Sequence, residues 1–198
     1  MTEWITQLVE SLGYVGIALL MFLENLFPPI PSEVIMPLAG FAASEGKLDL
    51  AGVLFSGTVG TLAGALFWYT VARWLGEARL RNWANRHGRW VTLSGDDIGS
   101  LERWFCRHQS WALPAAHVIP GLRTLISIPA GIFSMPLARF IGLTILGAGL
   151  WNTALGAAGY LLGTQFSEVE RYLGPVSTAI MVAIVISYLW RVIRFQPR

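Results

Sequence analysis

The stretch of residues 24–40, ENLFPPIPSEVIMPLAG, constrains the fold of this chain more than any other. It has the apolar content of a membrane segment, yet it contains four prolines, Pro28, Pro29, Pro31 and Pro37. Each proline removes a backbone donor, so a continuous helix is not expected here. In lipid, broken backbone is tolerated only where it is buried in protein or lines a polar cavity. We therefore expect a re-entrant hairpin with its bend at PPIP; an interfacial loop that reaches water is the alternative.

Two acidic residues, Glu24 and Glu33, lie within this apolar stretch. A charged side chain at the bilayer centre costs roughly 2.5–3.5 kcal/mol or more, so each is a candidate for function. Prolines separate the two residues, which places them on different arms of the predicted hairpin. We expect them to act as proton-linked gates, because burial and a nearby arginine both influence the charge of a carboxylate. A structural role as helix caps is the alternative.

A second apolar stretch, residues 117–131 (HVIPGLRTLISIPAG), resembles the first. It is interrupted by Pro120 and Pro129 and closes at Gly131, and its polar members, His117 and Arg123, are basic. Two broken apolar segments in corresponding positions of two halves indicate the binding site of a transporter. The sequence therefore predicts two facing hairpins, one acidic and one basic.

The composition is that of an integral membrane protein. Hydrophobic residues make up 54% of the 198 residues and charged residues only 13%, with a mean hydropathy of +0.55. The single cysteine, Cys106, excludes an internal disulfide and a cysteine-based zinc site. The histidines and the cysteine do not cluster with ligand spacing, and no phosphate-binding loop or nucleophile motif occurs. We therefore expect no cofactor, no metal site and no enzymatic activity.

The chain divides into two hairpin-and-crossing units and a connector. An amphipathic segment at residues 4–12 precedes an apolar run at 14–23, and the two either span together or lie on the surface. The expected divisions of this single membrane domain are repeat 1 at about 14–76, an interfacial connector at 77–110, repeat 2 at about 111–163 and a final transmembrane helix at 174–195. The connector combines arginine with tryptophan, which favours a membrane surface over a nucleic-acid partner.

An internal repeat supports this division. The block Gly64-Ala-Leu-Phe-Trp68 with Gly76 has the same spacing as Gly147-Ala-Gly-Leu-Trp151 with Gly159. One crossing separates the two hairpins, so they must enter from opposite faces of the membrane. The expected fold is therefore an all-α integral membrane protein with two facing re-entrant hairpins in inverted repeats, together with transmembrane and amphipathic surface helices.

The two broken stretches also carry a family resemblance. The motif E-N-x-x-P-P-I-P-S-E at residues 24–33, followed by V-I-P-G-L-R-T…I-P-A-G at residues 118–131, resembles the DedA family of bacterial membrane proteins. That family shares its domain with lipid scramblases of the eukaryotic endoplasmic reticulum. Its usual motif is G-R-F-I-P-x-x-R, with two arginines. Arg123 matches the second arginine, whereas His117 stands in place of the first.

Arg123 and His117 are the candidates for binding a phosphate. A guanidinium stays charged and presents a fork that matches phosphate oxygens. At membrane depth Arg123 needs an anionic partner. We expect this partner to be Glu24 or Glu33 across the hairpin tips, a lipid phosphate, or each of these in turn. The alternative is an Arg–Glu ion pair with a purely structural role. A protonated imidazole at His117 would hold the same phosphate, and its charge would switch near neutral pH. A satisfied core histidine is the alternative for His117.

The predicted function is translocation of a phosphate-bearing lipid. The DedA resemblance implies that this lipid is undecaprenyl phosphate, returned to the cytoplasmic leaflet of the bacterial inner membrane, with protons as a coupling ion. A general phospholipid scramblase is a close variant. A proton-coupled antiporter of soluble cations or drugs, and a non-transporting assembly factor, are the alternatives from other classes. The sequence is compatible with a homo-oligomer and does not fix the oligomeric state.

The charge distribution predicts the orientation of the chain. Six arginines lie in residues 76–110 and three at the C-terminus, and these two segments lie two crossings apart. The positive-inside rule places both in the cytoplasm. In a Cys106→Ser background, we expect Arg86→Cys to be shielded from impermeant thiol reagents in intact cells, and Lys47→Cys to be labelled. Labelling of Arg86→Cys from outside would reverse this topology.

Overall fold

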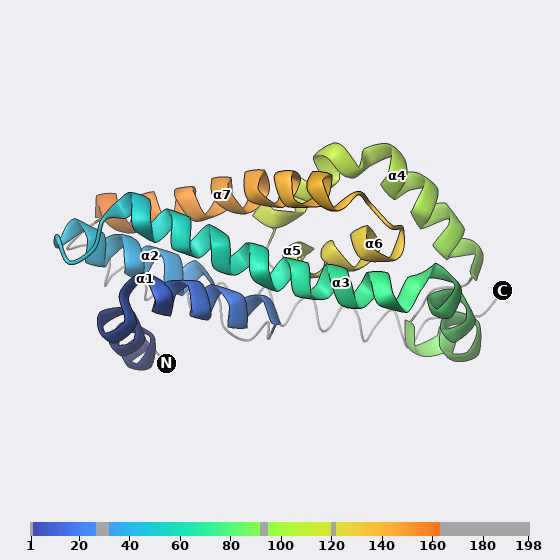
Figure 1. Cartoon of the computed structure of the whole chain (residues 1–198), viewed down its shortest axis with the longest axis horizontal. Coiled ribbons are helices and arrows are strands. Elements are labelled where there is room, and N and C mark those ends of the chain that lie inside the picture. Colours follow the sequence, from blue (N-terminus) through green and yellow to red (C-terminus); the bar gives the residue numbers. More distant parts are fainter. Residues whose placement is uncertain (1, 27–31, 92–94, 120–121, 163–198) are drawn as a thin grey trace.

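The computed structural model describes residues 2–26, 32–91, 95–119 and 122–162 (Figure 1). The predicted final helix at 174–195 lies outside these residues, as do Pro28, Pro29, Pro31 and Pro120. Within the described ranges every regular element is a helix, and the helices are α1 (Thr2–Leu26), α2 (Ser32–Ser44), α3 (Leu50–Val91), α4 (Gly95–Val118), α5 (Leu122–Leu125), α6 (Ser127–Ile132) and α7 (Leu137–Leu162).

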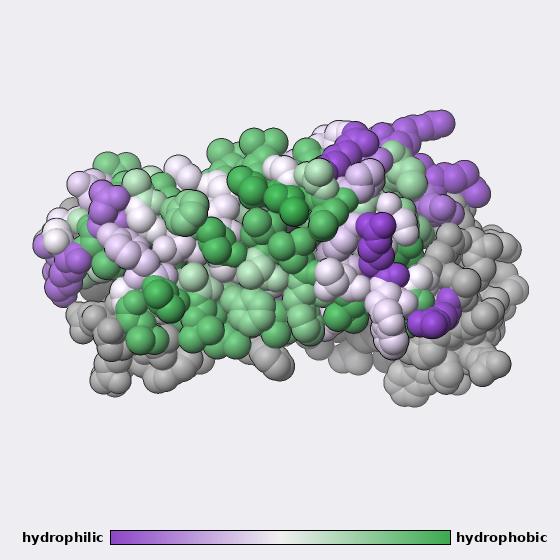
Figure 2. Space-filling model, in the orientation of Figure 1, coloured by the Kyte–Doolittle hydropathy of each residue, from purple (hydrophilic) through white to green (hydrophobic). Residues whose placement is uncertain are grey.

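Two of these helices contain stretches that are long and apolar enough to cross a membrane, Leu50–Gly76 in α3 and Leu137–Leu162 in α7. They lie in the first and second predicted repeats, and both run along the long axis of the molecule (Figure 1). The third predicted crossing, at 174–195, lies outside the described residues. The outer faces of both helices carry exposed large apolar side chains, such as Phe55 and Trp74 on α3 and Leu150 and Leu161 on α7. Figure 2 shows hydrophobic residues over the middle of one face of the molecule, with hydrophilic residues toward its ends. This surface suits a membrane whose normal follows the long axis.

Glycines in the left-handed conformation shape two of the helices. Gly13 has φ 54° and kinks α1, so that the segment before it turns away from the rest of the helix (Figure 1). The remaining apolar part, Leu12–Leu26, is shorter than the roughly 20 residues that a crossing needs. The N-terminal region therefore does not form one straight spanning helix. Gly76, with φ 72°, similarly marks the point where the apolar part of α3 ends.

The connector is more helical than expected. Helix α3 continues beyond Gly76 to Val91, and α4 runs from Gly95 through Ser110 to Val118. The expected division between connector and second repeat at residue 110 thus falls inside one helix. The chain changes there from polar to apolar residues, but Ser110, Trp111 and Ala112 include neither glycine nor proline, and nothing interrupts the helix.

Each broken stretch supplies two arms that pack on different crossing helices. The part of α1 after Gly13 packs on α3, while α2 runs in the opposite direction and packs on α7. In the second half, α4 packs on α7 and α6 packs on α3. Helix α2 leads to one end of the molecule and α6 to the other (Figure 1). This exchange of partners is the arrangement that inverted repeats require, whereas re-entry of the hairpins into lipid stays a prediction.

Close approach at glycines makes this packing possible. A Cβ atom at Gly159 of α7 would collide with the backbone carbonyl of Pro37 in α2, and one at Gly131 of α6 would collide with the carbonyl of Tyr69 in α3. The α6–α7 turn is held further by the Tyr69 hydroxyl, which donates to the Met135 carbonyl, and by Arg73, which donates to the same oxygen at 3.4 Å. Small residues thus allow backbones to meet, as is usual between membrane helices.

The helix–helix contact at Gly159 can be tested against an open glycine on the same helix. We expect Gly159→Ala to destabilise the protein by about 1–3 kcal/mol, because the new methyl group meets backbone that cannot rotate away. Gly149 has open space around its Cα, so Gly149→Ala should leave stability unchanged or raise it slightly. Thermal melts of the detergent-solubilised variants compare the two. Equal melting temperatures for both variants would contradict the close α2–α7 packing.

Candidate functional site

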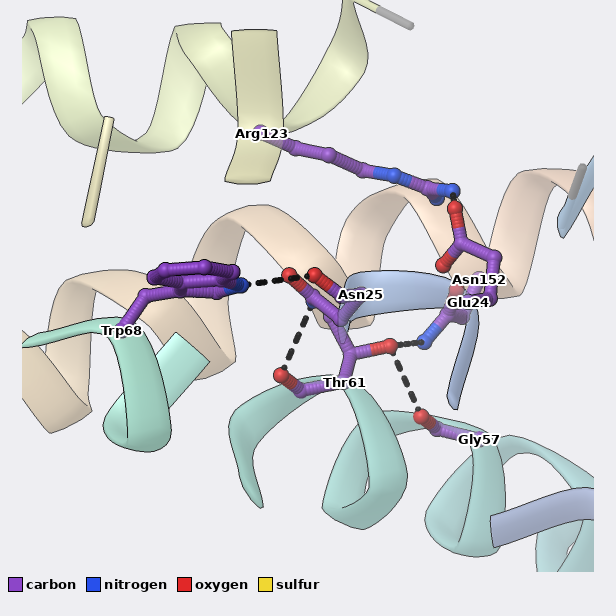
Figure 3. A network of polar contacts seen from close by, with 7 residues as sticks. All are labelled: Glu24, Asn25, Gly57, Thr61, Trp68, Arg123 and Asn152. Carbon is purple, nitrogen blue, oxygen red and sulfur yellow. Dashed lines mark hydrogen bonds and ion pairs between the residues drawn. The ribbon is translucent and has the colours of Figure 1, made fainter. Parts of the chain in front are cut away.

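A buried ion pair joins the end of α1 to the one-turn helix α5. Arg123 on α5 contacts Oε1 of Glu24 in the last turn of α1, and the two side chains are only 6% and 4% exposed. Figure 3 shows Arg123 extending from its short helix to the Glu24 carboxylate. Two of the residues predicted from the sequence to carry function are therefore brought together, from opposite halves of the chain.

The one-turn helix α5 has polar residues inside and apolar residues outside. Arg123 and Thr124 are buried, whereas Leu122 and Leu125 are 46% and 55% exposed. This pattern is the reverse of that in a water-soluble protein and fits a segment whose leucines face lipid tails. A guanidinium held beside such leucines lies close to the surface on which the tail of a lipid would rest.

Hydrogen bonds join the ion pair to both crossing helices. Asn25, the neighbour of Glu24, donates through Nδ2 to the Thr61 carbonyl of α3 at 3.2 Å. The Thr61 hydroxyl donates to the Gly57 carbonyl at 2.9 Å and accepts from Nδ2 of Asn152 on α7 at 3.4 Å (Figure 3). The residues Asn25, Thr61 and Asn152 thus form a buried polar layer that links α1, α3 and α7.

The end of α1 is held by α3. The last carbonyls of a helix have no partner within the helix, and here Nε1 of Trp68 donates to the Asn25 carbonyl at 3.0 Å. Gly64 lies against the Cβ of Asn25, so a larger residue there would push the end of α1 away. This contact fixes the position of Glu24, which precedes Asn25 in the same turn.

His117 is buried near the end of α4. Its Nδ1–H donates to the Leu113 carbonyl at 2.8 Å, and its Cβ packs against Gly147 of α7. The only described contacts of His117 are with its own helix and with α7, so its predicted role beside Arg123 in binding phosphate stays a prediction.

The remaining predicted residues have separate places. Glu33 lies in the first turn of α2, on the opposite arm from Glu24 and half-buried, where its negative charge suits the helix dipole. Pro129 lies within α6, and Gly131 is the contact of that helix with α3. In the part of the chain that the structure describes, no group of three or more His, Cys, Asp or Glu side chains could hold a metal ion.

The sequence reasoning missed Asn25, Thr61, Trp68 and Asn152. Two signals were available: Asn25 stands beside Glu24 in the first motif, and Asn152 is an amide in an otherwise apolar crossing. Thr61 carried no signal, because a threonine in a membrane helix commonly bonds to its own backbone.

The fold and the site define a helical membrane protein with a buried ion pair between α1 and α5. The chain belongs to the VTT domain family, which includes the DedA proteins, and residues 30–161 match that domain. The resemblance indicated by the two motifs is thereby confirmed.

The relatives of this chain carry names of different kinds. The chain is 32% identical to undecaprenyl phosphate transporter A of Staphylococcus aureus, over 98% of this chain and 96% of that protein. It is also 32% identical to undecaprenyl phosphate transporter A of Bacillus subtilis, over 96% and 91%. An alkaline phosphatase-like protein of Lactococcus lactis is 36% identical over 100% and 93%. No solved structure matches the chain significantly.

The buried Arg123–Glu24 pair should contribute more to the free energy of unfolding than an exposed ion pair does. We expect Glu24→Gln to destabilise the protein by roughly 3–5 kcal/mol, because the buried Arg123 guanidinium then loses its carboxylate partner. Glu24→Gln combined with Arg123→Met should regain part of this loss, because the guanidinium that lost this partner is also removed. Denaturation of the purified protein in detergent measures both changes.

Glu45 provides the matched control. It pairs with Lys47 at 2.9 Å, but both side chains are exposed, so Glu45→Gln should cost at most about 1 kcal/mol. If Glu24→Gln were no more costly than Glu45→Gln, the Arg123–Glu24 pair would not hold the two tips together.

Proposed function

We propose that this protein translocates undecaprenyl phosphate to the cytoplasmic leaflet of the bacterial inner membrane. The observation that carries the proposal is the Arg123–Glu24 ion pair, buried where the two hairpin tips meet. A guanidinium at that depth has a strong requirement for an anion, and a phosphate headgroup can meet it as well as a carboxylate.

In this mechanism Glu24 and the phosphate alternate as partners of Arg123. Without substrate, Glu24 neutralises the guanidinium and holds the tips together. When a proton neutralises Glu24, the phosphate takes its place beside Arg123, and the headgroup passes between the tips while its tail stays in lipid beside Leu122 and Leu125. Return of the proton from Glu24 to the cytoplasm restores the ion pair and displaces the phosphate. Glu33, on the other arm, is the second candidate for this exchange.

The names of the relatives support this substrate. Two proteins of similar length, matched over nearly the whole chain, are named undecaprenyl phosphate transporter A. The direction of transport rests on the predicted orientation, in which the acidic hairpin opens outward and the basic hairpin inward. A proton gradient that is acidic outside would then favour release of Arg123 on the outer side.

Three other functions make different predictions for the same protein. A general scramblase would move phospholipids without preference, and an antiporter would use the acids to bind soluble cations or drugs. The name of the Lactococcus lactis relatives points to a third, cleavage of a phosphate ester. Each can be measured beside lipid transport in one reconstituted system.

The deciding experiment uses proteoliposomes that contain either undecaprenyl phosphate or phosphatidylglycerol with an acidic exterior. We expect phosphate exposed on the outer leaflet to disappear only with undecaprenyl phosphate. Arg123→Lys should slow this by about tenfold or more, because an ammonium cannot reproduce the two-pronged contact. Arg139→Lys is the control, because Arg139 is exposed and bonds Ser110 instead.

The outcomes separate the four functions. Loss of both lipids from the outer leaflet would indicate a scramblase, and release of inorganic phosphate would indicate a phosphatase. Movement of neither lipid, with proton-driven uptake of a cation, would indicate an antiporter. Equal rates for Arg123→Lys and Arg139→Lys would remove Arg123 from the mechanism.

A further inference from the structure

One exposed stripe of α4 changes along its length from basic to aromatic to aliphatic. Its members recur every three or four positions, so they lie on one side of the helix. They are Arg103, Arg107, Trp111, Ala115 and Val118. All five are exposed, whereas Phe105 and Leu113, on another side of the same helix, are buried in the second apolar cluster. The stripe is therefore the face that α4 turns away from the protein.

Three rings gather beside the middle of this stripe and form an aromatic cluster. The ring centroids of Trp104 and Trp111 are 6.1 Å apart, and the His108 ring lies 5.2 Å from the first and 5.9 Å from the second. Nδ1–H of His108 donates to the Trp104 carbonyl at 2.9 Å, which holds the imidazole in the cluster. Arg107 comes three residues after Trp104 and four before Trp111, so its side chain leaves the helix beside both indoles.

The aromatic cluster lies where α4 passes from polar to apolar sequence, at Ser110. Tryptophan favours the membrane–water interface, because its ring is apolar and its N–H can reach water. Figure 2 shows hydrophilic residues at the end of the molecule where Figure 1 places α4. From Arg103 to Val118 the stripe extends about 22 Å along the helix, which is more than the thickness of the headgroup region. Its basic end thus suits lipid headgroups and its aliphatic end suits lipid chains.

The charges around the basic end favour an anion. Glu102 is the only acidic residue at positions 102–118, and it lies about 140° around the helix from Arg107. Asp96 and Asp97 belong to the first turn of α4, farther from Arg107 along the chain. Arg139 of α7 donates to the Ser110 hydroxyl at 2.5 Å and so adds positive charge to this part of α4.

We propose that this stripe of α4 binds an anionic phospholipid at the membrane surface. The phosphate would lie at Arg107, the glycerol beside the aromatic cluster and one chain along Ala115 and Val118. A water-soluble protein could meet the basic end, but it could not cover the aliphatic end. A zwitterionic lipid offers the same chains, but its ammonium group would lie among guanidinium groups. The order of side chains along the stripe is therefore that of an anionic lipid, from headgroup to chain.

This site is separate from the Arg123–Glu24 pair and does not rest on the proposed function. Its lipid would be a resident of the membrane that is bound at the surface and is not carried across. The bound lipid would fix the depth of α4, the helix that precedes α5 and Arg123 in the chain. Lipid binding at α4 can therefore be measured without any transport.

The exposed Cys106, the only cysteine in the sequence, allows a test that reports on α4 alone. The purified full chain carries a donor fluorophore on Cys106 and is placed in nanodiscs of phosphatidylcholine. A small fraction of the lipid carries an acceptor on its acyl chain and is either phosphatidylglycerol or phosphatidylcholine, so that only the headgroup differs. We expect energy transfer to show phosphatidylglycerol enriched about fivefold or more over phosphatidylcholine beside α4, and the enrichment to fall at high salt.

Three changes at Arg107 test the role of its charge. Arg107→Gln should lose most of the enrichment, Arg107→Lys should retain it, and Arg107→Glu should abolish it, because attraction to an anionic headgroup needs a positive charge here. Arg79→Gln is the matched control. Arg79 is also exposed, but it lies on α3 with its guanidinium 5.3 Å from the Trp74 ring centroid, so its loss should leave the enrichment at α4 unchanged.

Two results would overturn the anionic-lipid site. Equal transfer to the two lipids in the wild-type protein would leave the tryptophans as an anchor without headgroup preference. Enrichment that persists in both Arg107→Gln and Arg107→Glu would place the attracting charge elsewhere. Arg123→Lys should retain the enrichment while it slows transport, so that this proposal and the proposed function can fail separately; loss of the enrichment in Arg123→Lys would place the lipid at Arg123 and also overturn the site.

Discussion

The contact between Arg123 and Glu24 is the interaction on which the rest of the structure depends. Two opposite charges are buried where α1 meets α5, and each lowers the cost of burying the other, because an uncompensated charge in a low-dielectric interior is costly. The pair therefore ties the first half of the chain to the second. The contact between the two halves also depends on the charge of Glu24. A proton on Glu24, or another anion in its place beside Arg123, would weaken this contact.

The surrounding packing keeps that centre in place without rigid covalent links. One apolar cluster, including Ile17, Met36 and Val53, surrounds the first hairpin, and another, including Tyr69, Leu113 and Phe140, surrounds the second. Along α3, Thr61 lies between Val53 of the first cluster and Tyr69 of the second, so the polar layer falls between two apolar cores. Glycine contacts at Gly131 and Gly159 let the second arm of each hairpin reach the crossing helix of the other half. Each half of the chain thus packs against the second arm of the other half, α2 on α7 and α6 on α3.

This organisation explains how a polar headgroup site can exist inside an apolar protein. The charged side chains of Glu24 and Arg123 are buried, while Leu122, Leu125 and the outer faces of α3 and α7 present apolar side chains outward. A lipid could keep its tail against this surface while its headgroup meets the centre. A guanidinium that stays charged and a carboxylate that can take up a proton suit a site at which one anion reversibly replaces another.

The sequence by itself determined the two crossings, the two interruptions and the candidates Glu24 and Arg123, because apolar runs, prolines and charges act locally. Only the tertiary structure decided that Glu24 contacts Arg123, that Asn25, Thr61 and Asn152 form one layer, and that His117 packs on α7. Those contacts join residues far apart in the chain and depend on how closely two backbones approach at Gly64, Gly131 or Gly147. The local sequence pattern also did not predict the kink at Gly13, because a glycine can stay helical or turn. Nor did it predict that α4 continues through Ser110, because a change of polarity does not end a helix.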